Sequence, residues 1–170
     1  HDIMEVRLKL PASERLQFLA GQYIEVILKD GRRRAFSIAN SPLEDDFLSL
    51  HIRYVPGGEF TEHVFNDLKA KEIWNFEGPL GNFYLRDSSR PAILVAGGTG
   101  LGPMKAILET AFEEGIERDF HLFFGVRTSQ DLYLTETLDQ WQREHANFRW
   151  TPALSNPGAE YFVVGYDGSG

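Results

Sequence analysis

The sequence predicts a chain of two parts, an all-β antiparallel barrel followed by an α/β domain with a parallel sheet. Up to residue 88, short alternating segments are separated by turns that contain Gly and Pro, a pattern typical of antiparallel strands. After Arg90 and Pro91, continuous apolar runs alternate with helical patterns instead. We therefore expect one domain over residues 1–88 and a second over residues 89–170.

The first part contains segments in which apolar and polar side chains alternate, which indicates strands with one solvated face. The expected strands cover residues 3–10, 21–31, 32–39, 47–55 and 72–81. Asp30 and Gly31 are a hairpin turn signal between two of these strands. One helix is expected over residues 61–68, where Thr61 can serve as the N-cap.

The second part begins with the apolar run AILVA over residues 92–96, and a similar run, HLFFGV, covers residues 121–126. Both predict strands that are buried on both faces. Apolar residues at helical spacing predict helices over residues 104–115 and 131–145. FRWTPAL predicts a third strand over residues 148–154, and EYFVVG, over residues 160–165, is a candidate for a fourth. This alternation indicates a parallel sheet with right-handed crossovers.

Composition excludes several classes of function. The 170 residues carry a net charge of −8, which argues against a nucleic-acid or anionic-membrane surface because both require a positive field. The sequence has no cysteine, so it offers no disulfide and no cysteine-ligated iron–sulfur cluster. No segment is long and apolar enough to span a bilayer, and residues 1–15 lack a signal-peptide pattern. We expect a cytoplasmic protein without nucleic-acid or membrane partners.

The segment AGGTGLGP, residues 96–103, connects the first predicted strand of the second part to its helix. Ligands of parallel sheets bind beyond the carboxyl ends of the strands, and a helix start offers free N–H groups to a phosphate. The segment departs from the dinucleotide fingerprint, because Pro103 stands where its last glycine should be. Taken alone, a turn that merely connects strand and helix explains it equally well.

A second group of residues lies in the predicted strand over residues 32–39. Arg34 and Phe36 point to one side of this strand, and Ala35 and Ser37 point to the other. Arginine suits a phosphate, an aromatic ring offers a stacking surface, and a hydroxyl can bond to a ring nitrogen. Each residue also has an ordinary interpretation, as a core aromatic or a solvated arginine.

Further residues invite a functional reading that we do not favour. His51 and His63 lack a third metal ligand at suitable spacing and are expected near the surface. Glu109 and Glu113 are expected on the solvated face of a helix. Arg32 and Arg33 are expected as solvent-facing strand ends, with a docking patch for an acidic partner as the alternative; these residues lie in the predicted strand over 32–39.

Five motifs occur in a recognisable order. They are R-x-F-S from Arg34, G-G-x-x-T from Gly57, G-P-x-G-x-F-x-L from Gly78, G-G-T-G-x-G-P from Gly97 and G-x-R-x-x-x-D-L-Y from Gly125. Over about residues 1–155 this order resembles the ferredoxin–NADP reductase superfamily. The nearest resemblance is to NAD(P)H-dependent reductase components of bacterial oxygenases and of deoxysugar synthesis, and to NAD(P)H–flavin reductases.

The resemblance implies an antiparallel flavin-binding barrel followed by a parallel-sheet nicotinamide-nucleotide-binding domain. It implies FAD rather than FMN, because the GGEFT segment suits a pyrophosphate, and NADH or NADPH as hydride donor. The barrel residues are expected to act as follows: Arg34 binds the flavin phosphate, Phe36 packs on the isoalloxazine, Ser37 bonds near flavin N5, and Gly57, Gly58 and Thr61 hold the pyrophosphate.

In the second part, Thr99 is expected where nicotinamide meets flavin, with Gly98 and Gly100 along the pyridine nucleotide. Arg127 is expected to reach the adenosine ribose or its phosphate. Ser37 and Thr99 are the residues expected at the reacting rings, and the expected cofactor-binding set is completed by Ala35, Arg53, Phe60 and Gly97.

The implied function is a flavoprotein reductase that passes hydride from NAD(P)H to FAD and electrons on to a redox partner such as a ferredoxin or an oxygenase component. A flavin reductase that releases reduced flavin is one alternative, and a non-catalytic flavin- or nucleotide-binding module is another. The family's barrel begins with a strand before the stretch that His1 opens, and its last strand ends in Cys-Gly-Pro-Pro. Here EYFVVG is either a relic of that strand, with Val164 at the cysteine position, or unrelated sequence. We therefore expect both domains to be incomplete relative to the family.

Overall fold

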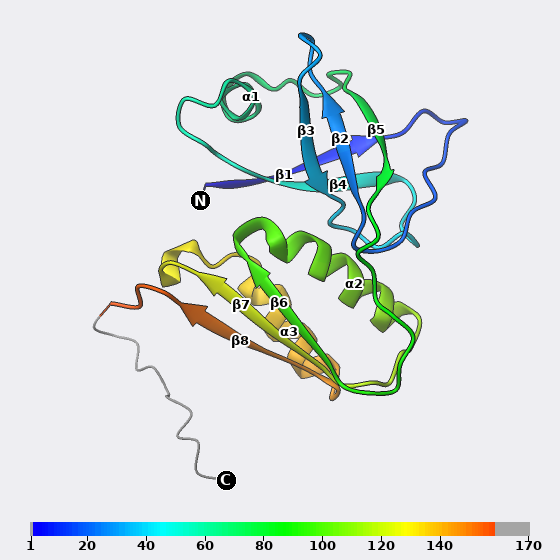
Figure 1. Ribbon diagram of the computed structural model, residues 1–170, viewed down its shortest axis with the longest axis vertical. Coiled ribbons are helices and arrows are strands. Elements are labelled where there is room, and N and C mark those ends of the chain that lie inside the picture. Colours follow the sequence, from blue (N-terminus) through cyan, green and yellow to red (C-terminus); the bar gives the residue numbers. More distant parts are fainter. Residues whose placement is uncertain (1, 159–170) are drawn as a thin grey trace.

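The computed structural model describes residues 2–158 and has two parts, one above the other in Figure 1. The first part is antiparallel, as expected. Its strands are β1 (Ile3–Lys9), β2 (Tyr23–Ile27), β3 (Arg33–Ser37), β4 (Phe47–Arg53) and β5 (Asn75–Leu80). One sheet pairs β1 with β4, and the other has the order β3-β2-β5. An isolated bridge between Ile38 and Leu50 joins the two sheets.

The antiparallel strands enclose one core, because each strand turns its apolar side chains inward. Ile24 from β2 and Leu50 from β4 are fully buried there. Between β4 and β5 lies a short helix, α1 (Glu59–Glu62), which continues as a π-helical turn over His63–Asp67. The expected N-cap was wrong: Gly58 is the N-cap of α1, and Thr61 lies inside the helix.

The second part is a parallel sheet with the strand order β6-β7-β8. The strands are β6 (Ala92–Gly97), β7 (Phe120–Val126) and β8 (Phe148–Leu154), connected by α2 (Leu101–Glu113) and α3 (Thr135–Glu144). The second helix was expected to begin at residue 131, but Ser129–Asp131 forms a separate 3₁₀ turn. Leu134 then takes a left-handed conformation with φ of 57°, so α3 begins only at Thr135.

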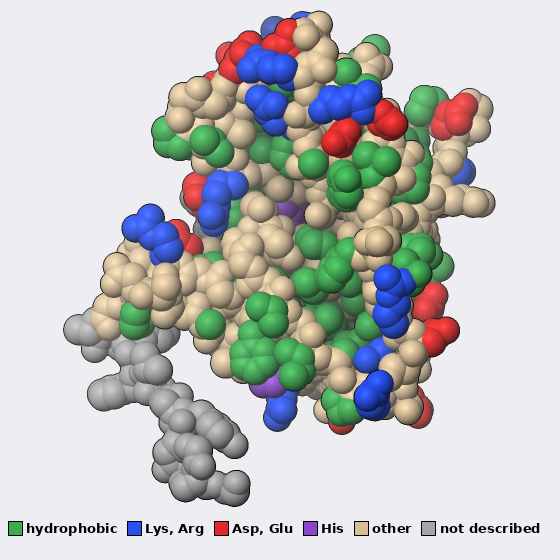
Figure 2. Space-filling model, viewed as in Figure 1, with side chains coloured by type: hydrophobic (Ala, Val, Ile, Leu, Met, Phe, Trp, Pro, Cys, Tyr) green, Lys and Arg blue, Asp and Glu red, His purple; other side chains and the backbone are tan. Residues whose placement is uncertain are grey.

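Within residues 2–158 the sheet is buried on one face, which corrects the expectation of two buried faces for residues 92–96 and 121–126. Along β6 buried and exposed residues alternate, and Ile93 and Val95 are 71% and 68% exposed. Both crossovers run in the same direction along the sheet, so right-handed connections place α2 and α3 on the same face. Figure 2 shows apolar side chains at the surface over the parallel sheet. The candidate strand over residues 160–165 lies outside the described residues.

Candidate functional site

The glycine turn after β6 lies directly against the antiparallel part of the molecule. Strand β6 ends at Gly97, a 3₁₀ turn spans Gly98–Gly100, and α2 begins at Leu101. Gly98 has φ of +53°, and a Cβ atom there would lie 3.3 Å from Nη1 of Arg53 at the end of β4. A Cβ at Gly97 or Gly100 would have no atom within 4 Å. The turn is therefore closed by an arginine on one side and open on the other.

A cavity of about 620 Å³ opens at this turn, beyond the carboxyl ends of the parallel strands. Its lining includes Arg53, Gly98, Gly125, Arg127 and Asp131. Gly97, the last residue of β6, and Gly125, the last residue but one of β7, are register partners, so two glycines lie side by side near the ends of neighbouring strands. Ligands of open parallel sheets bind at this edge, and the two arginines suit an anionic ligand.

Arg53 is the residue of this cavity with the most unusual environment. Its Nε atom is buried and lies 3.3 Å from Oδ2 of Asp2, yet among the described residues it has no hydrogen-bond partner. This nitrogen has an ion-pair partner in Asp2 but no well-aligned hydrogen bond, so an incoming acceptor would compete with Asp2 for it. Nearby, the pKa of Asp131 is lowered, mainly by hydrogen bonds from the Thr128 backbone and hydroxyl, with Arg127 and Arg53 adding to the effect.

Behind the turn, His51 of β4 is buried, whereas we expected it near the surface. Only 8% of the residue is exposed, and its Nδ1 lies 3.0 Å from the hydroxyl oxygen of Tyr133. Burial lowers the pKa of His51 to about 4, with the charge of Lys105 acting in the same direction. Burial also raises the pKa of Tyr133. Both groups are therefore neutral at physiological pH and act as packing and hydrogen-bonding partners.

Strand β3 presents its expected site residues on two opposite faces. Phe36 pairs in register with Ile24, and Arg34 pairs with Val26, so both lie on the face of the buried core. Ala35 and Ser37 lie on the other face. The ring of Phe36 packs on Phe60 with centroids 5.6 Å apart. Phe36 therefore has a protein partner of its own in the barrel.

The arginines of this strand differ in their partners. Arg32 pairs with Asp30 and Glu59, and Arg33 pairs with Glu25 and Glu77, so these two are neutralised by carboxylates. The guanidinium of Arg34 instead donates to the carbonyl of Arg33 at 2.9 Å. Within residues 2–158 no carboxylate forms an ion pair with Arg34, so its charge is available to an anion.

The loop from Val55 to Thr61 is closed by its own side chains. The hydroxyl of Thr61 lies 3.0 Å from the carbonyl of Val55 and accepts from the Val55 N–H at 3.1 Å. Phe60 is 9% exposed, and its ring packs on Phe36 and Trp74 in the core. Gly57 has φ of +75°, and a Cβ there would meet no atom within 4 Å. The Gly57 N–H donates to Glu62 at 3.3 Å and the Gly58 N–H to the carbonyl of Val55 at 2.9 Å, so these backbone groups have partners within the loop. The side chains of Phe60 and Thr61 hold the shape of the loop.

The structure brings together Arg53, Gly98 and Arg127 at one cavity. Residues 34–37 and 57–61 do not line this cavity; they meet each other in the barrel, where Phe36 packs on Phe60. Sequence reasoning missed Gly102, at which a Cβ would lie 3.3 Å from the Cβ of Ala39. Gly102 stands inside the AGGTGLGP segment, but glycine spacing alone does not distinguish a ligand contact from a helix contact. Gly125 at the end of the second strand was a signal that could have located the cavity.

Comparisons with known proteins agree with this architecture. Residues 1–84 match the family described as the oxidoreductase FAD-binding domain, and residues 94–164 match the oxidoreductase NAD-binding domain. Reductase component 2 of terephthalate 1,2-dioxygenase from Comamonas sp is 39% identical over 158 residues, 92% of this chain and 47% of that protein. The CDP-6-deoxy-L-threo-D-glycero-4-hexulose-3-dehydrase reductase of Yersinia pestis is 36% identical over 91% of this chain and 46% of its own length.

Solved structures give the same result. The Amycolatopsis cytochrome P450 reductase GcoB superposes with a TM-score of 0.85 at 39% identity, covering 94% of this chain and 49% of that one. Phthalate dioxygenase reductase, at 23% identity and a TM-score of 0.77, shares the fold over 95% of this chain and 50% of its own. The chain thus spans about half the length of the relatives it matches.

None of the helices within residues 2–158 has the length and apolarity that a bilayer crossing needs. The antiparallel sheets, the parallel sheet with its glycine turn, the two domain matches and the reductase relatives point to one group of proteins. The chain belongs to the ferredoxin–NADP reductase superfamily and carries an oxidoreductase FAD-binding domain followed by an oxidoreductase NAD-binding domain.

Proposed function

We propose that this chain is the flavin- and nicotinamide-binding part of an NAD(P)H-dependent reductase. In this proposal residues 1–88 bind FAD and residues 89–170 bind NADH or NADPH. When bound, the two cofactors supply hydride transfer between nicotinamide and flavin. The observation that carries the proposal is the proximity of Arg53, at the end of barrel strand β4, to Gly98 of the nucleotide turn, since both line one cavity and a Cβ at Gly98 would lie 3.3 Å from Nη1 of Arg53. This proximity brings the end of a barrel strand to the proposed nucleotide surface.

The residues present fit both cofactors. Arg34 has a charge that no described carboxylate neutralises, which suits a phosphate group. Gly57 leaves room for a ligand to approach, although its N–H would have to leave Glu62 in order to bind a phosphate. At the other surface, Arg53 has a buried Nε without a hydrogen-bond partner, beside a cavity that Arg127 also lines. Gly97 and Gly100 leave the turn open on the side facing away from Arg53.

The proposed roles follow from these positions. Arg34, Gly57 and Gly58 hold the flavin phosphates, and Ala35 and Ser37 present the outer face of β3 to the ring system. Thr99, between Gly98 and Gly100, lies where the nicotinamide would meet that ring. Arg53 and Arg127 hold the anionic part of the pyridine nucleotide. The side chains of Phe60 and Thr61 support the shape of the flavin surface from the core side. Phe36, which packs on Phe60, is the residue expected to pack on the isoalloxazine.

We further propose that electrons pass to a protein acceptor such as a ferredoxin or an oxygenase component, in a cytoplasmic setting. The relatives support this, since one is a reductase component of a dioxygenase and another a deoxysugar dehydrase reductase. A flavin reductase that releases reduced flavin is the alternative, and no further observation on this chain favours it.

An absorbance spectrum of the purified chain, followed by anaerobic mixing with NADH or NADPH, tests the proposal. We expect a flavin spectrum that bleaches on mixing, and flavin that stays with the protein during turnover. Exchange of the bound flavin with free flavin would favour the flavin reductase. A chain that stays colourless in excess FAD, or a bound flavin that neither nucleotide reduces, would refute the proposed function.

A further inference from the structure

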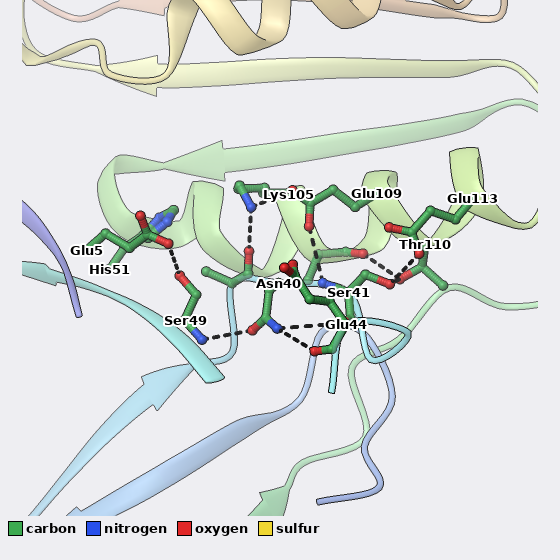
Figure 3. A network of polar contacts seen from close by, with 12 residues as sticks. Glu5, Asn40, Ser41, Glu44, Ser49, His51, Lys105, Glu109, Thr110 and Glu113 are labelled. Carbon is green, nitrogen blue, oxygen red and sulfur yellow. Dashed lines mark hydrogen bonds and ion pairs between the residues drawn. The ribbon is translucent and has the colours of Figure 1, made fainter. Parts of the chain in front are cut away.

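The face of α2 that meets the antiparallel part carries charged residues. Glu109 is largely buried there, in contrast to the solvated position that we expected, whereas Glu113 is exposed as expected. Figure 3 shows this contact between α2 and the segment Ala39–Ser41, which follows β3. At its start the helix approaches so closely that a Cβ at Gly102 would lie 3.3 Å from the Ala39 Cβ and 3.4 Å from Nδ1 of His51. A side chain at position 102 would push the two parts of the molecule apart.

Further along the same face, Lys105 and Glu109 bind the backbone of this segment. The ammonium group of Lys105 donates to the carbonyl of Ala39 at 3.0 Å and pairs with Glu109. The second carboxylate oxygen of Glu109 accepts from the backbone N–H of Ser41 at 3.2 Å. The side chains of Lys105 and Glu109 are only 17% and 22% exposed. Removing either charge would leave its partner poorly solvated, so the pair resists small displacements.

The next turn of α2 continues the contact. Glu113 accepts from the hydroxyl of Ser41 at 3.0 Å, and Ser41 is 1% exposed. Residues 102, 105, 109 and 113 are spaced three and four apart, so they form one stripe of the helix. The whole stripe therefore packs against the antiparallel part, at Ala39, Ser41 and His51.

On its other side, the same segment is fixed within the barrel. Asn40 is 1% exposed, and its amide donates to the carbonyl of Phe47 at 2.9 Å and accepts from the N–H of Ser49 at 2.8 Å. The hydroxyl of Ser49 in turn donates to Glu5 of β1 at 2.7 Å. Ala39–Ser41 thus transmits the position of α2 to β4 and β1.

This segment lies between the two proposed cofactor surfaces. Ser37, expected at the flavin ring, is two residues before Ala39, and Thr99, expected at the nicotinamide, is three residues before Gly102. We propose that Lys105 and Glu109 are positioning residues for hydride transfer: through Ala39 and Ser41 they set the separation of the two rings without touching either cofactor. This inference rests on the proposed function. The rate of hydride transfer falls steeply as the two rings move apart. Loosening the contact between α2 and Ala39–Ser41 should therefore lower this rate more than it lowers cofactor affinity.

The test uses the full chain loaded with FAD and compares Lys105→Met and Glu109→Gln with the wild type. Glu114→Gln, which removes an exposed carboxylate at the end of the same helix, is the control, and Lys105→Arg is the conservative variant. Anaerobic stopped-flow mixing with NADH gives the reduction rate at saturation and the apparent NADH affinity. We expect Lys105→Met and Glu109→Gln to lower the saturating rate by about 10- to 100-fold. FAD content and NADH affinity should stay at the wild-type level, and Lys105→Arg should recover most of the rate.

A second measurement does not depend on activity. The chain has no cysteine, so spin labels can be attached at Ile73→Cys in the barrel and Glu136→Cys in α3. Both positions are exposed. The distribution of distances between the labels should be narrow in the wild type and in Glu114→Gln. It should widen in Lys105→Met and Glu109→Gln.

The inference is overturned if both variants reduce flavin at the wild-type rate, or if their distance distributions stay narrow. It is also overturned if the rate falls only in proportion to lost FAD, because the residues would then be merely structural. The reduction of flavin in the wild-type chain shows whether the positioning role alone has failed or the proposed function as well. If NADH does not reduce even the wild-type flavin, the proposed function fails and the positioning role fails with it.

Discussion

At the scale of single residues, the partner of a side chain decides what it is free to do. Three consecutive arginines illustrate this in and beside β3. Arg32 and Arg33 are each paired with two carboxylates, whereas Arg34 donates to a backbone carbonyl. The sequence RRR is chemically uniform, so only the fold distinguishes the arginine that keeps an available charge from the two that do not.

We therefore expect Arg34→Ala to weaken FAD binding by about 1.5–3 kcal/mol, the typical loss of a charge-assisted contact. Arg33→Ala is the matched control, since it removes the neighbouring arginine on the opposite face of the strand, where Glu25 and Glu77 occupy it. Titration of the apoprotein with FAD measures both affinities. Equal affinities for the two variants would remove Arg34 from the flavin site.

His51 gives a prediction about pH. Burial lowers its pKa to about 4, while in the unfolded chain it has its ordinary value near 6.5. As pH falls from about 6.5 to about 4, the unfolded chain takes up a proton that the folded chain does not, so the free energy of unfolding falls by up to about 3 kcal/mol. Above pH 6.5 this group has no effect.

Urea unfolding across this pH range, for the wild type and His51→Asn, measures the effect. The asparagine amide can still meet the Tyr133 hydroxyl but does not titrate, so the variant should lose part of the wild-type slope. Burial raises the pKa of Glu109, so protonation of this carboxyl stabilises the folded chain as pH falls, opposite to the effect of His51. Both proteins contain Glu109, so its effect cancels when their free energies of unfolding are subtracted. Parallel stability curves would show that His51 titrates normally in the folded chain.

At the scale of elements, the sequence predicted the strands and the glycine turn but not the contacts that the helices make. Alternation in β4 and the apolar run of β8 follow from local patterns, and both strands occur as expected. Helical spacing also identified α2, but a glutamate that faces a polar loop has the same spacing as one that faces water. Glu109 was therefore misassigned, because its partner Ser41 is remote in the sequence. Glu113 is exposed as expected, although it also accepts from Ser41.

The turn before α2 separates two kinds of glycine. Gly100 has open space where a Cβ would lie, whereas Gly98 has positive φ and lies against Arg53. We expect Gly100→Val to leave folding and FAD content unchanged and to abolish flavin reduction by NADH, because the valine would occupy the open side of the turn. Gly98→Ala should in addition lower the free energy of unfolding by about 1 kcal/mol. Normal NADH reduction by Gly100→Val would exclude this turn from the nucleotide site.

At the scale of the whole molecule, the described chain has an antiparallel part of two sheets joined by one isolated bridge, followed by a parallel sheet with helices on one face. In Figure 1, α2 runs along the boundary between the two parts, so it serves both the sheet core and the interface. The sequence predicted strands that are buried on two faces. An apolar run such as AILVA occurs both in strands with one covered face and in strands with two, so the run alone does not distinguish them. The number of covering layers depends on the direction of the crossovers, which no local pattern contains.

One-sided burial can be tested with two neighbouring residues of β6. Leu94 is 7% exposed and packs in the sheet core, whereas Ile93 is 71% exposed on the other face. We expect Leu94→Ala to lower the free energy of unfolding by about 2–5 kcal/mol, from lost burial and the cavity it leaves. Ile93→Ala should lower it by less than about 1 kcal/mol, through strand propensity alone. Urea unfolding of both variants measures the difference. Similar losses would mean that the outer face is covered in solution, and that the sheet of this chain is the middle layer of three.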